Sequence, residues 1–94
     1  MPLNAHADVA TATPERYAKQ LASHLGRKAE IREEDAGVRI VLTVGDCLLT
    51  STDGVLHLTA TAEDDAGLDV VTDVVGRHLE RFGQRNELVV TWSR

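Results

Sequence analysis

The sequence has few aromatic and few basic residues. Aromatics make up 3% of the 94 residues, and they are Tyr17, Phe82 and Trp92. Three separate rings offer no platform on which nucleic-acid bases could stack. Ten lysines and arginines stand against fifteen aspartates and glutamates, which gives a net charge of -5. Because binding to a phosphate backbone needs clustered cations, we expect no nucleic-acid partner.

Cysteine and long apolar runs are equally scarce. Cys47 is the single cysteine, so no disulfide can form within the chain. No stretch approaches the roughly 18 apolar residues that a membrane span requires. The residues from Met1 to Val9 contain neither the basic region nor the apolar region of a secretory signal peptide. We therefore expect a cytoplasmic protein without a membrane segment.

The length and composition fit one small domain, residues 1–94, whose core is built from Val, Leu, Ile and Ala. Its first helix is predicted to begin at Thr13-Pro14-Glu15. The threonine hydroxyl can cap a free N–H group, proline suits the first helical position, and glutamate meets the positive end of the helix dipole. This helix is expected to end at Leu25, where Gly26 follows.

A second helix is predicted over residues 68–82 by apolar residues at helical spacing. One polar residue, His78, falls inside the apolar stripe and not at its edge. Acidic residues precede this helix and basic residues stand toward its end, as the helix dipole favours. The stripe consists of Leu68, Val71, Val75, Leu79 and Phe82.

Between and around the helices the sequence alternates with the period of two that is typical of strands. Turns are expected at Asp35-Ala36-Gly37, at Gly45-Asp46 and at Asp53-Gly54. The resulting order, β-α-β-β-β-β-α-β, predicts an α+β fold in which two helices cover one face of a mainly antiparallel, curved sheet. The predicted strands are residues 7–11, 29–33, 38–44, 47–51, 55–61 and 87–92, the last of them placed beside the first.

The strand at residues 55–61 predicts how the two faces of the sheet differ. Leu56, Leu58, Ala60 and Ala62 point to one side, and Val55, His57, Thr59 and Thr61 point to the other. The first face is expected to pack on the helices. His57 is expected on the second face, which is either solvated or covered by a partner.

His24 and His78 are the first candidates for a functional site. His24 lies near the apolar face of the first helix, so the fold could bring the two imidazoles together. Neutral imidazole suits iron, zinc, copper and nickel. The alternative is that each histidine is a structural residue that donates a hydrogen bond to a backbone carbonyl. Cys47 is either a third, soft ligand or a small buried apolar residue.

Arg77, Arg81 and Arg85 recur every four residues in the second helix and its continuation, with Asp69 and Asp73 on the same side. They form either a grip for an anionic ligand or a solvated face stabilised by ion pairs between successive turns. The sequence contains no H-E-x-x-H, no G-x-S-x-G and no phosphate-binding glycine loop. We therefore expect a binding or accessory domain and not an enzyme, with no cofactor indicated.

Two motifs resemble a known bacterial family. The first is R-Y-x-x-Q-L-x-x-H, from Arg16 to His24, and the second is H-L-x-R-F, from His78 to Phe82. Together with Gly45-Asp46-Cys47 and Trp92 they resemble domain-of-unknown-function family 2218 nearly end to end. Members often carry a cysteine at the position of Ala22, so this chain lacks that thiol.

The resemblance implies a fold similar to the TATA-binding-protein-like or helix-grip folds. Family members occur beside, or fused to, flavin-dependent siderophore-interacting reductases. This association implies an accessory role in iron or siderophore metabolism, with such a reductase as a candidate partner. Arg16 and Tyr17, which match the motif, would provide polar contacts at the mouth between helix and sheet. Tyr17 would otherwise pack in the core.

Two hypotheses from different classes follow. In the first, the domain binds a small molecule or a metal ion between the helices and the sheet. In the second, it is an interaction module that pairs with a protein partner or with a second copy of itself. Val41, Val55 and Val89 are expected on the sheet face away from the helices, where a homodimer would cover them.

Overall fold

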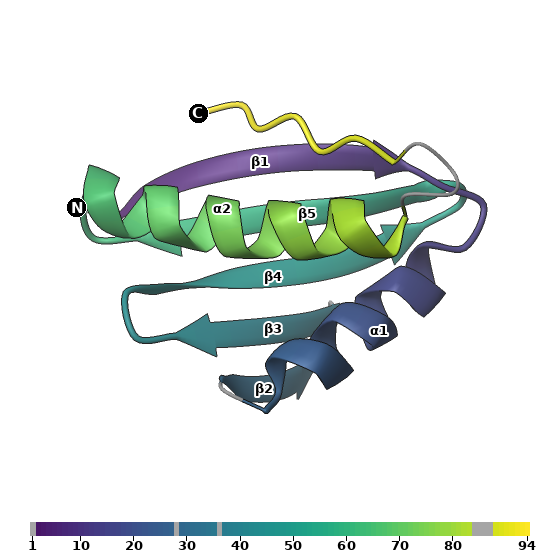
Figure 1. Cartoon of the computed structure of the whole chain (residues 1–94), viewed down its shortest axis with the longest axis horizontal. Coiled ribbons are helices and arrows are strands. Elements are labelled where there is room, and N and C mark those ends of the chain that lie inside the picture. Colours follow the sequence, from purple (N-terminus) through teal and green to yellow (C-terminus); the bar gives the residue numbers. More distant parts are fainter. Residues whose placement is uncertain (1, 28, 36, 84–87) are drawn as a thin grey trace.

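A computed structural model describes residues 2–27, 29–35, 37–83 and 88–94. It confirms the α+β fold, with an antiparallel sheet in the order β1-β5-β4-β3-β2 and two helices (Figure 1). In chain order the elements are β1 (Leu3–Ala10), α1 (Pro14–Leu25), β2 (Glu30–Glu34), β3 (Gly37–Leu42), β4 (Gly45–Thr52), β5 (Val55–Ala62) and α2 (Asp65–Phe82).

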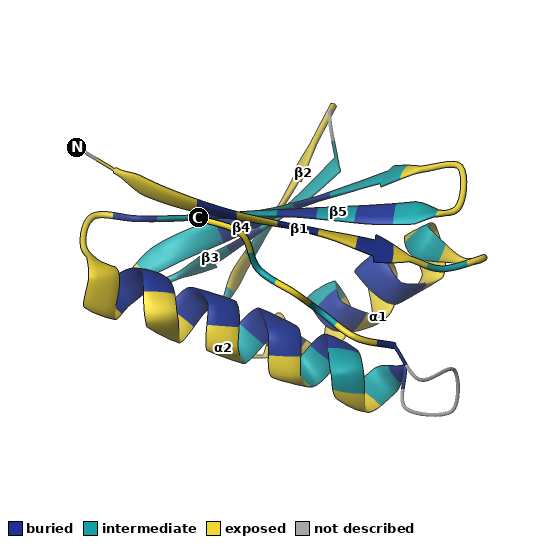
Figure 2. Ribbon diagram, turned by 90° about the horizontal axis from the view of Figure 1, so that it is seen from above, coloured by how far each residue is buried: buried dark blue, intermediate teal, exposed yellow. Residues whose placement is uncertain are grey.

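Both helices pack on the same face of the sheet, and no described element covers the other face (Figure 2). We call these the covered face and the open face. The predicted alternation in β5 is confirmed, because every second residue from Leu56 to Ala62 is buried. Small side chains let α2 approach the sheet closely. In one row across four strands, Ala5, Ala60, Cys47 and Ile40 are each at most 1% exposed.

The two helices begin differently. Pro14 stands in the first turn of α1 as predicted, but the expected cap by the Thr13 hydroxyl is wrong, since that side chain makes no capping hydrogen bond. Instead the Thr13 N–H donates to Thr11 Oγ1 at 3.2 Å. In α2 the side chain of Asp64 forms the cap, accepting from the Gly67 N–H at 2.7 Å.

The hairpin between β3 and β4 turns two residues earlier than predicted. Leu42 pairs with Gly45, so Thr43 and Val44 form the turn and Gly45 begins β4. A Cβ atom at position 45 would lie 2.3 Å from the Thr61 carbonyl oxygen and 3.0 Å from Val71 Cγ2. Glycine is therefore needed here for the close approach of β5 and α2 and not for a turn.

The turn at Asp53-Gly54 is confirmed, with Thr52 paired to Val55 and Gly54 at a φ of 74°. At the expected turn before β3, Glu34 pairs with Gly37, and Ala36 lies outside the described residues. β1 is longer than predicted, because it pairs with β5 along its whole length from Leu3.

The predicted last strand is wrong as a strand. Glu87 lies outside the described residues, and the segment 88–94 forms a single antiparallel bridge, between Ser93 and His6. The segment does run along β1, as expected (Figure 1). Apart from this bridge, its described contacts are with α2: the Val90 N–H donates to Glu80 Oε2 at 2.9 Å, and Trp92 packs over Gly76.

Candidate functional site

The helix junction brings together the two histidines that the sequence predicted to meet. His24 comes from the last turn of α1 and His78 from α2, and their ring centres are 5.0 Å apart with the planes inclined at 45°. The rings of Phe82 and His24 are nearly perpendicular, and their centres are 5.3 Å apart. Leu21, Leu25, Val75 and Leu79 are buried on the covered face, which fixes the helices side by side.

His78 and His24 differ in their surroundings. His78 is half-buried, and its Nδ1 lies 2.6 Å from the Val74 carbonyl oxygen. Because a carbonyl can only accept, Nδ1 carries a proton and donates it, and in the neutral imidazole the lone pair is then on Nε2. His24 is exposed, and its described contacts are the rings of His78 and Phe82. The junction therefore presents basic ring nitrogens at a solvent-accessible place.

Cys47 lies in the core and is 1% exposed, as expected of a small buried apolar residue. Burial raises the pKa of its thiol from the ordinary 9.0 to about 12. At neutral pH it is a thiol and not the thiolate that binds metals. Among the described residues there is no group of three His, Cys, Asp or Glu side chains that could hold a metal ion.

An open pocket of about 610 Å³ adjoins the helix junction. Residues of the first motif form one side of it: Arg16, Tyr17 and Gln20. Tyr17 also packs in the core, where it is 7% exposed. Phe82 connects this pocket to the histidines, since it lines the pocket and contacts His24. We call it the Arg16 pocket; its lining is Ala10, Thr11, Ala12, Thr13, Arg16, Tyr17, Gln20, Phe82 and Leu88.

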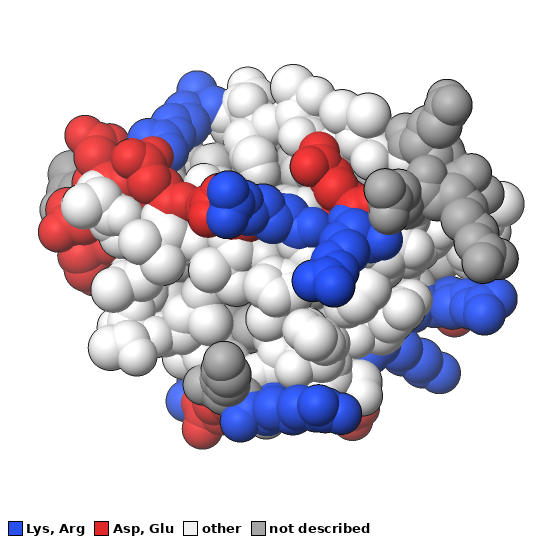
Figure 3. All heavy atoms as spheres, viewed as in Figure 1, with Lys and Arg blue, Asp and Glu red and all other residues white. Residues whose placement is uncertain are grey.

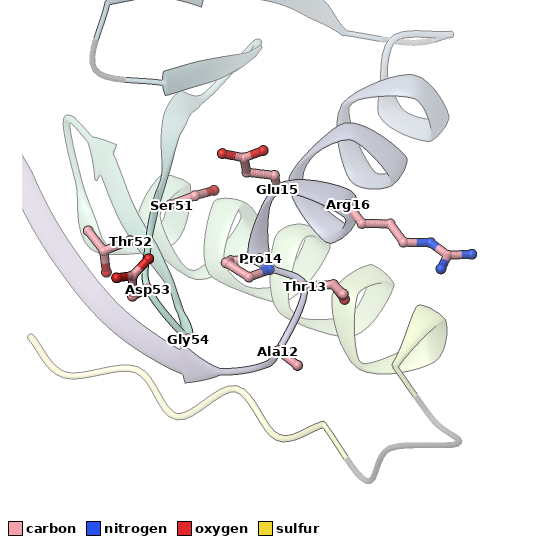
Figure 4. A pocket seen from close by; sticks show the side chains of 9 residues that line it. All are labelled: Ala12, Thr13, Pro14, Glu15, Arg16, Ser51, Thr52, Asp53 and Gly54. Carbon is pink, nitrogen blue, oxygen red and sulfur yellow. The ribbon is translucent and has the colours of Figure 1, made fainter.

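The charge of the Arg16 pocket contrasts with that of the whole chain. Among the residues that the structure describes, its lining includes one cation, Arg16, and no carboxylate, although the net charge of the chain is -5. A second pocket, of about 440 Å³, lies between the start of α1 and the β4–β5 turn, and its charged lining residues are Glu15, Asp53 and again Arg16. The Arg16 side chain points away from that turn (Figure 4). Its guanidinium makes no ion pair with any described residue.

Of the three arginines considered as a grip for an anionic ligand, the structure describes Arg77 and Arg81. Arg77 pairs with Asp73 at 3.2 Å, and both side chains are more than half exposed. Arg81 is exposed, and Arg85 lies outside the described residues. On this side of the molecule acidic side chains gather over the beginning of α2, and basic side chains further along are scattered between acidic ones (Figure 3). The arrangement supports the alternative of a solvated face with ion pairs.

Sequence reasoning missed a hydrogen-bonded chain on the open face. His57 Nδ1 lies 2.6 Å from Asp8 Oδ1, and His57 Nε2 lies 2.9 Å from the Thr52 hydroxyl. The order resembles a nucleophile–base–acid triad. The three residues stand on the adjacent strands β1, β5 and β4, so the register of the sheet brings them together. A local pattern could not find this chain, because it depends on the pairing of β1 with β5.

A second polar group on the open face surrounds Arg39. Its guanidinium donates to Asp46 at 2.7 Å and to Glu34 at 2.8 Å. The hydrogen bond from Arg39 lowers the pKa of Glu34, and the same bond raises the pKa of Arg39. The chain through His57 and the group around Arg39 therefore both place polar side chains that have partners on the open face.

Comparisons with known proteins agree with the fold. A family model described as "Uncharacterized protein conserved in bacteria (DUF2218)" matches residues 6–93. The NMR structure of PA4090 from Pseudomonas aeruginosa is similar, with a TM-score of 0.78 and 23% sequence identity over 96% of this chain and 94% of that chain. None of the curated proteins compared with the chain matches it. Neither described helix is long and apolar enough to cross a membrane.

Proposed function

Since the chain belongs to the uncharacterized bacterial family DUF2218, we propose a function from the geometry of the site: the domain binds a small organic anion in the Arg16 pocket. The observation that carries the proposal is the charge of the described lining residues, which include one guanidinium and no carboxylate in a chain of net charge -5. A ligand with negative charge is attracted to this place and repelled from most of the surface.

The other side chains of the pocket indicate the shape of the ligand. Tyr17, Phe82 and Leu88 offer an apolar wall, and Gln20 adds an amide that donates and accepts hydrogen bonds. A volume of about 610 Å³ fits a molecule of moderate size. An aromatic carboxylate would place its ring against the wall and its charge on Arg16, since charge-assisted hydrogen bonds from arginine to carboxylate are strong.

The association of family members with siderophore-interacting reductases makes a siderophore fragment the first ligand to test. In this proposal the domain is an accessory of iron acquisition that holds an acidic, aromatic iron chelator, and the reductase is its partner. A carboxylated catechol such as 2,3-dihydroxybenzoate combines the ring with the charge that the pocket selects.

NMR titration of the full chain with 2,3-dihydroxybenzoate tests the proposal. We expect the amide signals of Arg16, Gln20 and Phe82 to shift with saturation. Arg16→Gln should weaken binding about ten-fold or more, because a hydrogen bond to a charged group contributes about 1.5 to 3 kcal/mol. Arg77→Gln is the matched control, since it removes the same charge outside the pocket. Equal binding of uncharged catechol, or an unchanged affinity in Arg16→Gln, would contradict the proposal.

Self-association through the open face is the second candidate. Val41 and Val55 lie in strands on that face, but Val89 does not: it belongs to the C-terminal segment, where it is 66% exposed. The ion pairs of Arg39 and the hydrogen bonds of His57 occupy much of the same face. Sedimentation at high micromolar concentration tests this candidate, and a monomer throughout would exclude it.

A further inference from the structure

We infer that His24 and His78 together bind a divalent first-row transition metal ion, such as zinc or copper. Two imidazoles that share a tetrahedral ion have ring centres about 5 Å apart, because each nitrogen lies about 2.0 to 2.1 Å from the ion. The observed ring centres are 5.0 Å apart. The two helices thus hold the rings at the spacing that a shared ion requires before any ion arrives.

The hydrogen bond of His78 supports this assignment. A histidine that binds a metal through one nitrogen usually donates the other N–H to a carbonyl or carboxylate, which fixes the tautomer and the ring orientation. His78 donates from Nδ1 to the Val74 carbonyl at 2.6 Å. In the neutral ring this contact selects the tautomer whose Nε2 can bind a metal, and it restrains the orientation of the ring. Because the donor and acceptor are on successive turns of α2, the helix itself sets the direction of the ring.

His24 has the complementary properties. It is exposed, so an ion can reach it from solvent without any movement of the core. The Phe82 ring packs against it with the ring centres 5.3 Å apart and the planes at 79°, which limits the orientations that the imidazole can take. The pair therefore consists of one anchored ligand and one accessible ligand.

The number of ligands determines the kind of site. With no third His, Cys, Asp or Glu grouped with this pair among the described residues, the ion keeps coordination positions for water or for a chelating molecule. Such a site exchanges its metal and does not serve as a structural zinc site, which is closed by four protein ligands. The inference does not depend on the Arg16 pocket holding an anion, although Phe82 is a wall of both places.

Calorimetric titration of the full chain, without a histidine tag, with zinc chloride tests the inference. We expect one saturable site per chain. His24→Ala and His78→Gln should each weaken it about ten-fold or more, since each removes one of only two protein ligands. His6→Ala is the matched control: His6 is exposed on β1, and its loss should leave the affinity unchanged. Circular dichroism of each variant reports whether the fold is intact.

Electron paramagnetic resonance of the copper-loaded protein gives an independent readout. Two equivalent nitrogen ligands should be visible in the wild type and only one in His24→Ala. His24 is exposed, so that variant tests the site even if His78→Gln unfolds. Absence of saturable zinc binding by the wild type, or unchanged binding by His24→Ala, would overturn the inference. Loss of zinc binding in His6→Ala would show that the site lies elsewhere.

Discussion

Histidines on the two sides of the sheet use their ring nitrogens differently. On the open face, both nitrogens of His57 are engaged, one by Asp8 and one by the Thr52 hydroxyl. At the helix junction, His78 engages one nitrogen, and His24 meets described residues only through its ring. A histidine whose nitrogens are both engaged stabilises cross-strand pairing, whereas one with a spare nitrogen can take a ligand. The comparison therefore agrees with the metal site inferred at the helix junction, whereas the ring nitrogens of His57 on the open face already have partners.

The largest expected effect is a difference in stability loss between two neighbouring residues of β4 that point to opposite faces of the sheet. Leu49 is buried under the helices, and Leu48 is half-buried on the open face. Leu49→Ala should destabilise the domain by about 2 to 5 kcal/mol, because it leaves a cavity, and Leu48→Ala by less than about 1 kcal/mol. Urea unfolding of both variants measures the difference. Equal losses would mean that something covers the open face in solution, which would favour self-association.

Gly45 tests how closely the covered face is packed. Gly45→Ala would place a methyl group 2.3 Å from the Thr61 carbonyl and 3.0 Å from Val71. We expect a loss of about 1 to 3 kcal/mol from overpacking. Gly54→Asn is the control and should have a smaller effect. A Cβ atom at position 54 would meet no atom within 4 Å beyond its chain neighbours, and asparagine tolerates the positive φ of this position. If Gly45→Ala unfolds at the same urea concentration as the wild type, the approach of β5 and α2 is looser than described.

Local patterns in the sequence predicted most of the fold, because each face of a helix or strand carries residues of one kind, apolar or polar, at a regular spacing. The alternation in β5, the stripe of α2 and the Asp53-Gly54 turn depend on neighbouring residues alone. Gly45 was misread because glycine serves both turns and close contacts, and only the position of α2 distinguishes them. The segment 88–94 alternates like a strand, but its contacts with Glu80 and Gly76 bind it to α2.

Only one part of the candidate site could be predicted from the sequence, namely the part that depends on which residues share the apolar face of each helix. The meeting of His24 and His78 followed from two helices on one face, and the structure confirms that they meet. The Arg16 pocket could not be foreseen as a cavity, since its wall combines the loop after β1, α1 and Phe82. The His57 chain needs the register in which Asp8 stands opposite His57, which no local pattern encodes.

Cys47, which is buried on the covered face, should make the stability of the domain depend on pH, with a smaller effect than the substitutions above. Its pKa is about 12 in the folded chain and 9.0 is its ordinary value, so the unfolded chain releases the proton first as the pH rises. Stability should therefore be lost between pH 9 and about pH 12, by about 1 kcal/mol at pH 10 relative to Cys47→Ala. Denaturation at pH 7 and pH 10 checks this difference. A native thiol that reacts rapidly with a disulfide reagent at pH 8 would mean that Cys47 is not buried.

The smallest expected effect is on the open face. Asp8 is 73% exposed and His57 36% exposed, so solvent screens their contact, and exposed pairs contribute less than about 1 kcal/mol. Asp8→Asn should therefore shift the unfolding midpoint only slightly, and zinc binding not at all, because the pair at the helix junction is unchanged. Urea unfolding and zinc titration of this one variant test both statements. Unaltered zinc affinity with a small loss of stability would agree with a metal site at the helix junction and a structural role for His57. A weakened zinc affinity would instead indicate that the metal binds on the open face.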